Sequence, residues 1–161
     1  MAKYFWGEQT NTVHKMRVVI PSQFKNILPE EIVEKQVGNE VITEKIRTVV
    51  VTLGRNSEIL VYPVKAWEKI FKRNAEHNKR FLKYHLKYVY TQELEGPGRI
   101  RISEKLQAIT KVTDKVDAII RGEGSHMSIW NPEVYAEYEK STDNIDPSEF
   151  DEMDYWVVED D

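Results

Sequence analysis

Hydrophobic and polar residues follow an order of short elements that occurs twice along the chain. In the first stretch, residues 12–20 are β-branched and basic and end at a proline, which predicts a strand. The apolar positions of residues 21–28 fall on one face of a short helix with proline near its first turn. A hairpin is then expected, with strands at 48–53 and 58–62 joined by the turn 54–57.

Two further segments follow the same kind of argument. Residues 64–88 carry apolar side chains at helical spacing, interrupted by the polar stretch 74–78, which predicts a long helix or two helices with a break between them. Residues 29–45 are charged and contain a possible turn at 37–40.

The second stretch repeats the plan of the first without the charged segment. Its strand contains a Gly-Pro-Gly turn, and Ser103 is a plausible N-cap for its short helix. The predicted elements are a strand at 94–102, a helix at 103–109, hairpin strands at 116–121 and 127–130, and a closing helix at 132–140.

The two stretches share particular residues as well as a pattern. Arg17 opens the first copy and Arg99 opens the second, 82 positions later. Each copy closes on two aromatic residues five positions apart, which we expect to be core anchors for the hairpins: Tyr62 with Trp67, and Trp130 with Tyr135. Units of about 50 residues bury little core alone, so we expect two half-domains packed together and further stabilised by oligomerisation.

Composition places the chain among ordinary globular proteins. It has 161 residues, 40% of them hydrophobic and 31% charged, and it contains no cysteine. No apolar run is long enough for a transmembrane helix or a signal peptide, so a cytoplasmic location without membrane contact is expected. Residues 141–161 hold nine acidic groups and no basic ones, which leaves residues 1–140 with a net charge of +5.

Several motifs in this order resemble the MraZ family of bacterial regulators, which are built from two tandem SpoVT/AbrB-like half-domains. The family signature has the form Asp-x-Lys-Gly-Arg, three residues and proline. Here it corresponds to 13–21, which keeps the lysine, arginine and proline, and to 95–103, which keeps the glycine and arginine. Residues 80–83 resemble the family's basic central helix. The resemblance covers residues 5–139 and identifies the chain as a divergent member.

The resemblance implies an α+β, β-rich fold. Two pseudo-repeated AbrB-type swapped-hairpin half-domains would form one barrel-like core, with a helical connector and a C-terminal helix. The implied boundaries are 1–63 for the first half-domain, 64–90 for the connector, 91–140 for the second half-domain and 141–161 for a flexible acidic tail.

The resemblance also implies a function. The chain would be a repressor that binds double-stranded DNA as a homo-oligomeric ring on repeated operator boxes and is associated with the nucleoid. The expected DNA-binding residues are Lys15, Arg17, Arg99, Arg101, Arg80 and Lys83. Arginine suits this role because its guanidinium makes paired hydrogen bonds to guanine or phosphate. Two alternatives remain open: Arg17 and Arg99 form structural ion pairs between the half-domains, and the basic helix is a solvated face.

The first signature departs from the family pattern at two positions. Val13 stands in place of the aspartate that would accept hydrogen bonds from the turn, and Met16 stands in place of a glycine that allows positive φ. We therefore expect the first turn to be rebuilt, which puts DNA reading by this half in question.

A different class of function is also compatible with the sequence. The acidic tail contains the aromatic residues Phe150, Tyr155 and Trp156, which would dock a basic protein partner in an antitoxin-like or viral regulator. The other interpretations are a solubilising tail and a degenerate paralogue that keeps only the assembly. The four histidines have no metal-ligand spacing, and no nucleophile or phosphate-loop motif occurs, so we expect neither metal, cofactor nor enzymatic activity.

Overall fold

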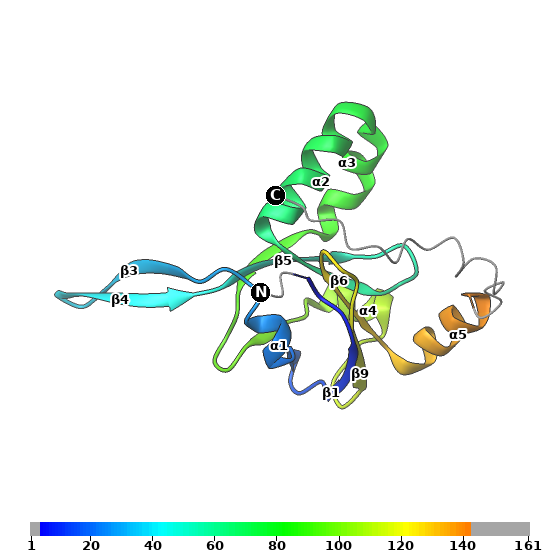
Figure 1. Cartoon of the computed structure of the whole chain (residues 1–161), viewed down its shortest axis with the longest axis horizontal. Helices are drawn as coiled ribbons and strands as arrows, with labels where there is room; N and C mark the ends of the chain where they lie inside the picture. Colours follow the sequence, from blue (N-terminus) through cyan, green and yellow to red (C-terminus); the bar gives the residue numbers. More distant parts are fainter. Residues whose placement is uncertain (1–3, 143–161) are drawn as a thin grey trace, which may run out of the picture.

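The computed structural model describes residues 4–142 as a strand-rich α+β protein (Figure 1). This confirms the α+β, β-rich class expected from the sequence. The helical elements are α1 (Ser22–Lys25), α2 (Val64–His77), α3 (Lys79–His85), the 3-10 turn η1 (Leu86–Tyr88), α4 (Glu104–Thr110) and α5 (Pro132–Thr142).

The main structural element is a six-stranded antiparallel sheet in the order β1-β9-β10-β6-β5-β7. Its strands are β1 (Glu8–Thr12), β5 (Thr48–Leu53), β6 (Ile59–Pro63), β7 (Tyr90–Glu93), β9 (Asp117–Gly122) and β10 (Met127–Trp130). The hairpins β5-β6 and β9-β10 agree with the prediction and meet at the centre of the sheet through β6 and β10. Each outer strand pairs with a hairpin that is distant in sequence, β1 with β9 and β7 with β5.

Two smaller pairs of strands complete the fold. The strand β2 (Arg17–Val19) pairs antiparallel with β8 (Arg99–Arg101). The strands β3 (Glu31–Val37) and β4 (Glu40–Ile46) form a two-stranded ribbon that extends away from the body (Figure 1). One continuous core cluster contains buried side chains from both stretches of the chain, including Val18 and Ile100.

The two opening strands are shorter than the sequence predicted. Within the strand expected at 12–20, only Arg17–Val19 forms a strand, β2, because Val13 bonds to the backbone of residues 115 and 116 and a turn follows at 14–17. The strand β1 ends at Thr12, so most of it lies before this range and was not predicted. Within the strand expected at 94–102, only Arg99–Arg101 forms a strand, β8, and the turn that holds Gly96 and Gly98 precedes it. The strand β7 ends at Glu93, before this range, and was not predicted. In both places the chain leaves the large sheet and crosses to the β2-β8 pair.

The charged segment 29–45 contains structure that was not predicted. The turn at 37–40 is confirmed, with Gly38 at φ 63°, but both flanks form seven-residue strands. The pattern of apolar positions gave no signal for a buried face because nearly all of these side chains are exposed.

The remaining helices agree with the predictions. The helical segment breaks at Asn78, between α2 and α3, and the hydroxyl of Ser103 caps α4 by accepting a hydrogen bond from the amide of Leu106 at 3.2 Å. The closing aromatic pairs are largely buried and have similar geometries, with ring centroids 5.7 Å apart for Tyr62 and Trp67 and 5.2 Å for Trp130 and Tyr135.

Candidate nucleic-acid interface

The β2-β8 pair brings four of the expected cationic residues to one place. Its register sets Arg17 opposite Arg101 and Val18 opposite Ile100. Val18 and Ile100 are buried in the core. Because successive side chains of a strand point to opposite faces, the arginines of both strands point outward. Arg99 lies opposite Val19, next along the same outer face.

Lys15 extends this face at the turn between β1 and β2. The amide of His14 donates to the carbonyl of Arg17 at 2.8 Å, and the amide of Arg17 donates back at 3.0 Å. Lys15 and Met16, which lie between His14 and Arg17, have left-handed backbones with φ of 49° and 69°. The expectation that methionine would not take the place of glycine at positive φ is therefore wrong, because Met16 adopts this conformation itself.

The missing aspartate of this turn is replaced from elsewhere in the chain. The carboxylate of Asp114 accepts a hydrogen bond from the amide of Lys15 at 2.9 Å, across 99 positions of sequence. The neighbouring amide of Lys115 donates to the carbonyl of Val13 at 2.8 Å, so exposed Lys115 lies beside the first turn. Neither residue was predicted, since only the folded chain brings the loop 111–116 against the turn.

The second turn depends on its glycines. Gly96 and Gly98 have φ of 51° and 115°, and the amide of Arg99 closes the turn on the carbonyl of Glu95 at 2.8 Å. A Cβ at Gly96 would lie 2.9 Å from the Nη2 of Arg99, so the Arg99 guanidinium folds back over the turn. A Cβ at Gly98 would lie 2.9 Å from the side chain of Lys25, which places another cation here.

Glu95 connects the arginines of the two strands. Its carboxylate lies 2.5 Å from Nε of Arg17 and 3.4 Å from Nη2 of Arg101. The hydrogen bond from Arg17, aided by the charges of Arg101 and Arg99, lowers the pKa of Glu95 although partial desolvation opposes this. The structural alternative thus holds for Arg17, which forms an ion pair between the two stretches of the chain.

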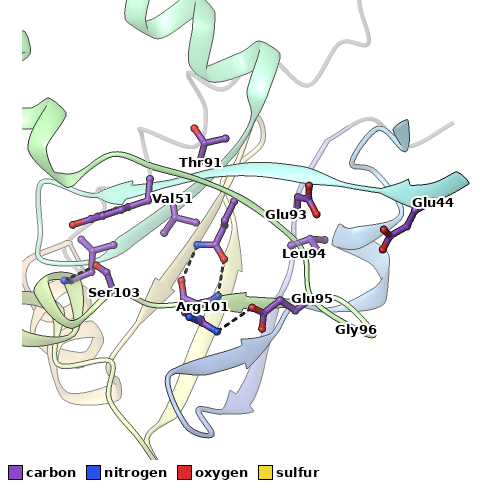
Figure 2. Close-up of a pocket in the computed structure, with 12 residues that line it drawn as sticks. Glu44, Val51, Thr91, Glu93, Leu94, Glu95, Gly96, Arg101 and Ser103 are labelled. Carbon is purple, nitrogen blue, oxygen red and sulfur yellow. Dashed lines mark hydrogen bonds and ion pairs between the residues drawn. The ribbon is translucent and has the colours of Figure 1, made fainter. Parts of the chain in front are cut away.

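Arg101 is held differently from Arg17. The side-chain amide of Gln92 makes two hydrogen bonds to the backbone of Arg101, each 2.8 Å long. It accepts one from the Arg101 amide and donates the other to the Arg101 carbonyl. The Arg101 side chain remains 54% exposed and reaches Glu95 only at its tip (Figure 2). Its guanidinium is therefore available to an external anion.

A groove of about 700 Å³ adjoins this cluster between β7, β8 and the base of the β3-β4 ribbon (Figure 2). The carboxylates of Glu44, Glu93 and Glu95 line it together with Arg101. Lys35 pairs with Glu44 and Glu93, and Arg17 pairs with Glu95. The cations therefore face outward from β2-β8, while the charged side chains that line the groove beside them are mainly carboxylates.

Arg80 and Lys83 lie on α3, in the helical pair that stands apart from the body (Figure 1). Both are exposed, and both lie near the Tyr84 ring, at 5.9 Å and 5.6 Å from its centroid. The structure thus brings together four of the six predicted DNA-binding residues and places the other two on a separate surface.

The remaining predicted sites have no counterpart in the described part of the chain. Phe150, Tyr155 and Trp156 lie outside the described residues. Between residues 4 and 142, no three histidine or carboxylate side chains gather closely enough to hold a metal ion. None of the helices in the same range has the length and apolar character required to cross a bilayer.

Comparison with known proteins finds relatives that match most of the chain. It is 28% identical over 144 residues to the transcriptional regulator MraZ of Caldanaerobacter subterraneus subsp. tengcongensis, covering 85% of this chain and 87% of the relative. The MraZ of Thermoanaerobacter sp. is 27% identical with the same coverage, and that of Limosilactobacillus fermentum is 23% identical, covering 92% and 93%. No protein-family model matches the chain.

Proposed function

Since the chain is a divergent member of the MraZ family, we propose that it is a DNA-binding transcriptional repressor that acts as a homo-oligomeric ring on repeated operator boxes. The relatives are named as transcriptional regulators, and the geometry of the β2-β8 pair supports the DNA-binding part of the proposal. Such a role places the protein in the cytoplasm with the nucleoid.

The observation that carries the proposal is the gathering of four cations on one outward strand pair and the turn that precedes it. Lys15, Arg17, Arg99 and Arg101 come from segments 82 positions apart and meet through the pairing of β2 with β8. A two-stranded antiparallel ribbon fits the major groove of B-form DNA, where arginine makes paired hydrogen bonds to guanine. Lysine and arginine beside the groove would also bind phosphate.

The cations divide into two roles in this proposal. Lys15 and Arg101 would contact DNA directly, because both side chains are exposed. Arg101 reaches Glu95 only at 3.4 Å and keeps 54% of its side chain exposed. Arg17 would act as a positioning residue, because its guanidinium is committed to Glu95 and to the carbonyl of Lys15 at 3.2 Å. Arg99, folded over the second turn, would hold that turn in place and add positive charge.

The assembly follows from the same family relationship. We propose that the pairing of each outer strand with a distant hairpin is the swapped-hairpin arrangement of two half-domains in one barrel-like core. One β2-β8 pair presents few cations, so a single copy would bind weakly. Several copies on repeated boxes would gain affinity because each further contact becomes intramolecular.

Titration of the full chain with its own upstream DNA, at two salt concentrations, tests the proposal. A scrambled duplex of equal length and composition serves as the control. We expect tighter binding to the upstream DNA and a loss of affinity with salt that reflects the phosphates contacted. Failure to bind the upstream DNA at low salt, or equal affinity for both duplexes, contradicts a sequence-specific regulator.

A further inference from the structure

The β3-β4 ribbon is an arm whose outer end is apolar but has no partner within the described part of the chain. Val37, Val41 and Ile42 near its tip are 59%, 65% and 42% exposed. The ion pairs that hold the ribbon join it to residues at or near its base: Lys35 binds Glu44 at 2.9 Å and Glu93 at 3.4 Å, and Lys45 binds Glu30 at 3.6 Å. Because a two-stranded ribbon is marginally stable alone in water, exposed aliphatic side chains at its tip favour contact with another protein surface.

The charge of the ribbon indicates what kind of surface it fits. Residues 31–46 contain four glutamates and two lysines, a net charge of −2. One of the lysines, Lys35, is already paired with two carboxylates. Glu34 and Glu40 make no ion pair with any described residue. An acidic arm is repelled by DNA and attracted to a basic protein surface.

The helical pair α2-α3 is a surface of that kind. Residues 64–88 carry eight lysines and arginines against two glutamates, and all ten of these side chains are exposed. Exposed apolar surface lies among them, at Phe71, Tyr84 and Leu86. The seven-residue strands of the ribbon span about 23 Å, and the 14 residues of α2 span about 21 Å. The two surfaces therefore have opposite charge, similar length and exposed apolar side chains.

The ribbon and the helical pair project from the body in different directions, so they do not meet within one copy (Figure 1). We propose that the β3-β4 ribbon of one copy docks on the α2-α3 pair of a second copy. This contact joins two different surfaces, so each copy keeps one of each free for the next neighbour, as a ring requires. The inference rests on the proposed homo-oligomer and assigns Arg80 and Lys83 to the protein interface instead of DNA.

Sedimentation velocity of the full chain without DNA tests the ribbon side of the contact. The variant Val41→Ser/Ile42→Ser removes apolar contact, and Glu34→Lys/Glu40→Lys reverses the charge. For each of these two variants, we expect that the protein concentration at which half of the chains are assembled is at least about tenfold higher than for the wild type. Glu133→Lys/Glu137→Lys in α5 is the matched control, with the same charge change away from the ribbon. Unchanged assembly of both ribbon variants, or a monomeric wild type, overturns the inference.

A charge swap tests the partner surface. Arg80→Glu/Lys83→Glu is expected to weaken assembly by itself and to restore it when combined with Glu34→Lys/Glu40→Lys, because the attraction is re-established with reversed signs. A combination that assembles no better than either reversed pair contradicts docking between these two surfaces. Circular dichroism on every variant identifies any loss of fold.

The absence of cysteine permits a direct proximity measurement. Val41→Cys and Tyr84→Cys proteins are mixed and treated with a short bismaleimide, and a mixed dimer of the two is expected. Val41→Cys mixed with Glu137→Cys is the control and should give none. Equal yields in both mixtures overturn the proposal. These readouts use no DNA, so they fail or succeed independently of the proposed regulator function.

Discussion

Arg17 and Glu95 lie 78 positions apart in sequence, yet Nε of Arg17 is 2.5 Å from Oε2 of Glu95. Arg17 begins β2 and Glu95 begins the turn before β8, so the ion pair ties the two signature segments to each other. The arginine that recurs in both segments thus has a structural task in the first.

The first prediction concerns the pH dependence of this pair. The pKa of Glu95 is lowered from its ordinary value of 4.5 by the Arg17 hydrogen bond. A carboxyl with a lowered folded pKa contributes stability that is present above the ordinary value and lost as the pH falls through the folded value. We expect Glu95→Gln to lower the urea midpoint at neutral pH, with the difference from wild type shrinking below pH 4.5.

Glu68→Gln is the matched control, because Glu68 is exposed on α2 and has no ion pair with a described residue. It should leave the urea midpoint close to that of the wild type throughout. A constant difference between the Glu95 variant and the wild type from pH 7 to about pH 3 would show that the charge of Glu95 does not contribute.

The second prediction separates positioning from contact. Arg17→Ala leaves Glu95 without its closest partner, so it should lower both thermal stability and DNA affinity. Arg101→Ala should weaken DNA binding by about 1–3 kcal/mol if the arginine reads a base, with little change in thermal stability because its side chain is half exposed. Thermal denaturation and DNA titration on both proteins check this, and equal losses of stability would contradict the division of roles.

The third prediction concerns Met16, whose left-handed backbone has φ 69°. That conformation costs an L-residue roughly 1–2 kcal/mol. Glycine avoids this cost, but it also gives the unfolded chain more conformational freedom, which offsets part of the gain in stability. We expect Met16→Gly to raise the free energy of unfolding slightly, by up to about 1 kcal/mol. Lys105→Gly, within α4, should lower it by about 1 kcal/mol. Destabilisation of comparable size in both would contradict the strain at Met16.

The fourth prediction concerns His85, which joins the helical pair to the sheet. Its Nε2 lies 3.0 Å from the Thr52 hydroxyl, and its ring stacks on Trp67 with centroids 6.1 Å apart. Burial lowers the pKa of His85 below its ordinary 6.5, so stability is present above pH 6.5 and is lost as the pH falls toward the folded value.

Urea denaturation at pH 7 and pH 5 measures this effect. The wild type should lose more stability across the interval than His85→Gln, which keeps a polar partner for Thr52. His126 is a second contributor, since burial also lowers its pKa. Exposed His77→Gln should behave like the wild type, and an identical loss in His85→Gln would exclude His85 as a source.

The elements that the sequence predicted well are those with strong local signals. Both central hairpins were predicted from β-branched runs around turns, and the break at Asn78 from a polar stretch within a helical pattern. The Ser103 cap was predicted from a single hydroxyl before an apolar-periodic segment.

The unpredicted features depend on distant or atypical residues. Lysine and methionine give no local sign of positive φ, so the left-handed backbones of Lys15 and Met16 were missed. Asp114 supports that turn only because the fold brings it there, 99 positions away. Local sequence also cannot decide whether Arg17 contacts DNA or Glu95, since that depends on side-chain geometry between two strands.

The central claim is that the outer face of β2-β8, and not the helical pair, contacts DNA. Its most direct test is the affinity for upstream DNA of Lys15→Ala/Arg101→Ala compared with Arg80→Ala/Lys83→Ala, each at two salt concentrations. Both variants lose two positive charges, so they serve as controls for each other. Sedimentation velocity is used first to find a protein concentration at which the two variants are assembled to the same extent, and the DNA titrations are carried out at that concentration. We predict a large loss of affinity and a shallower salt dependence for the first variant, with little change for the second. Wild-type affinity and salt dependence in Lys15→Ala/Arg101→Ala would contradict the account.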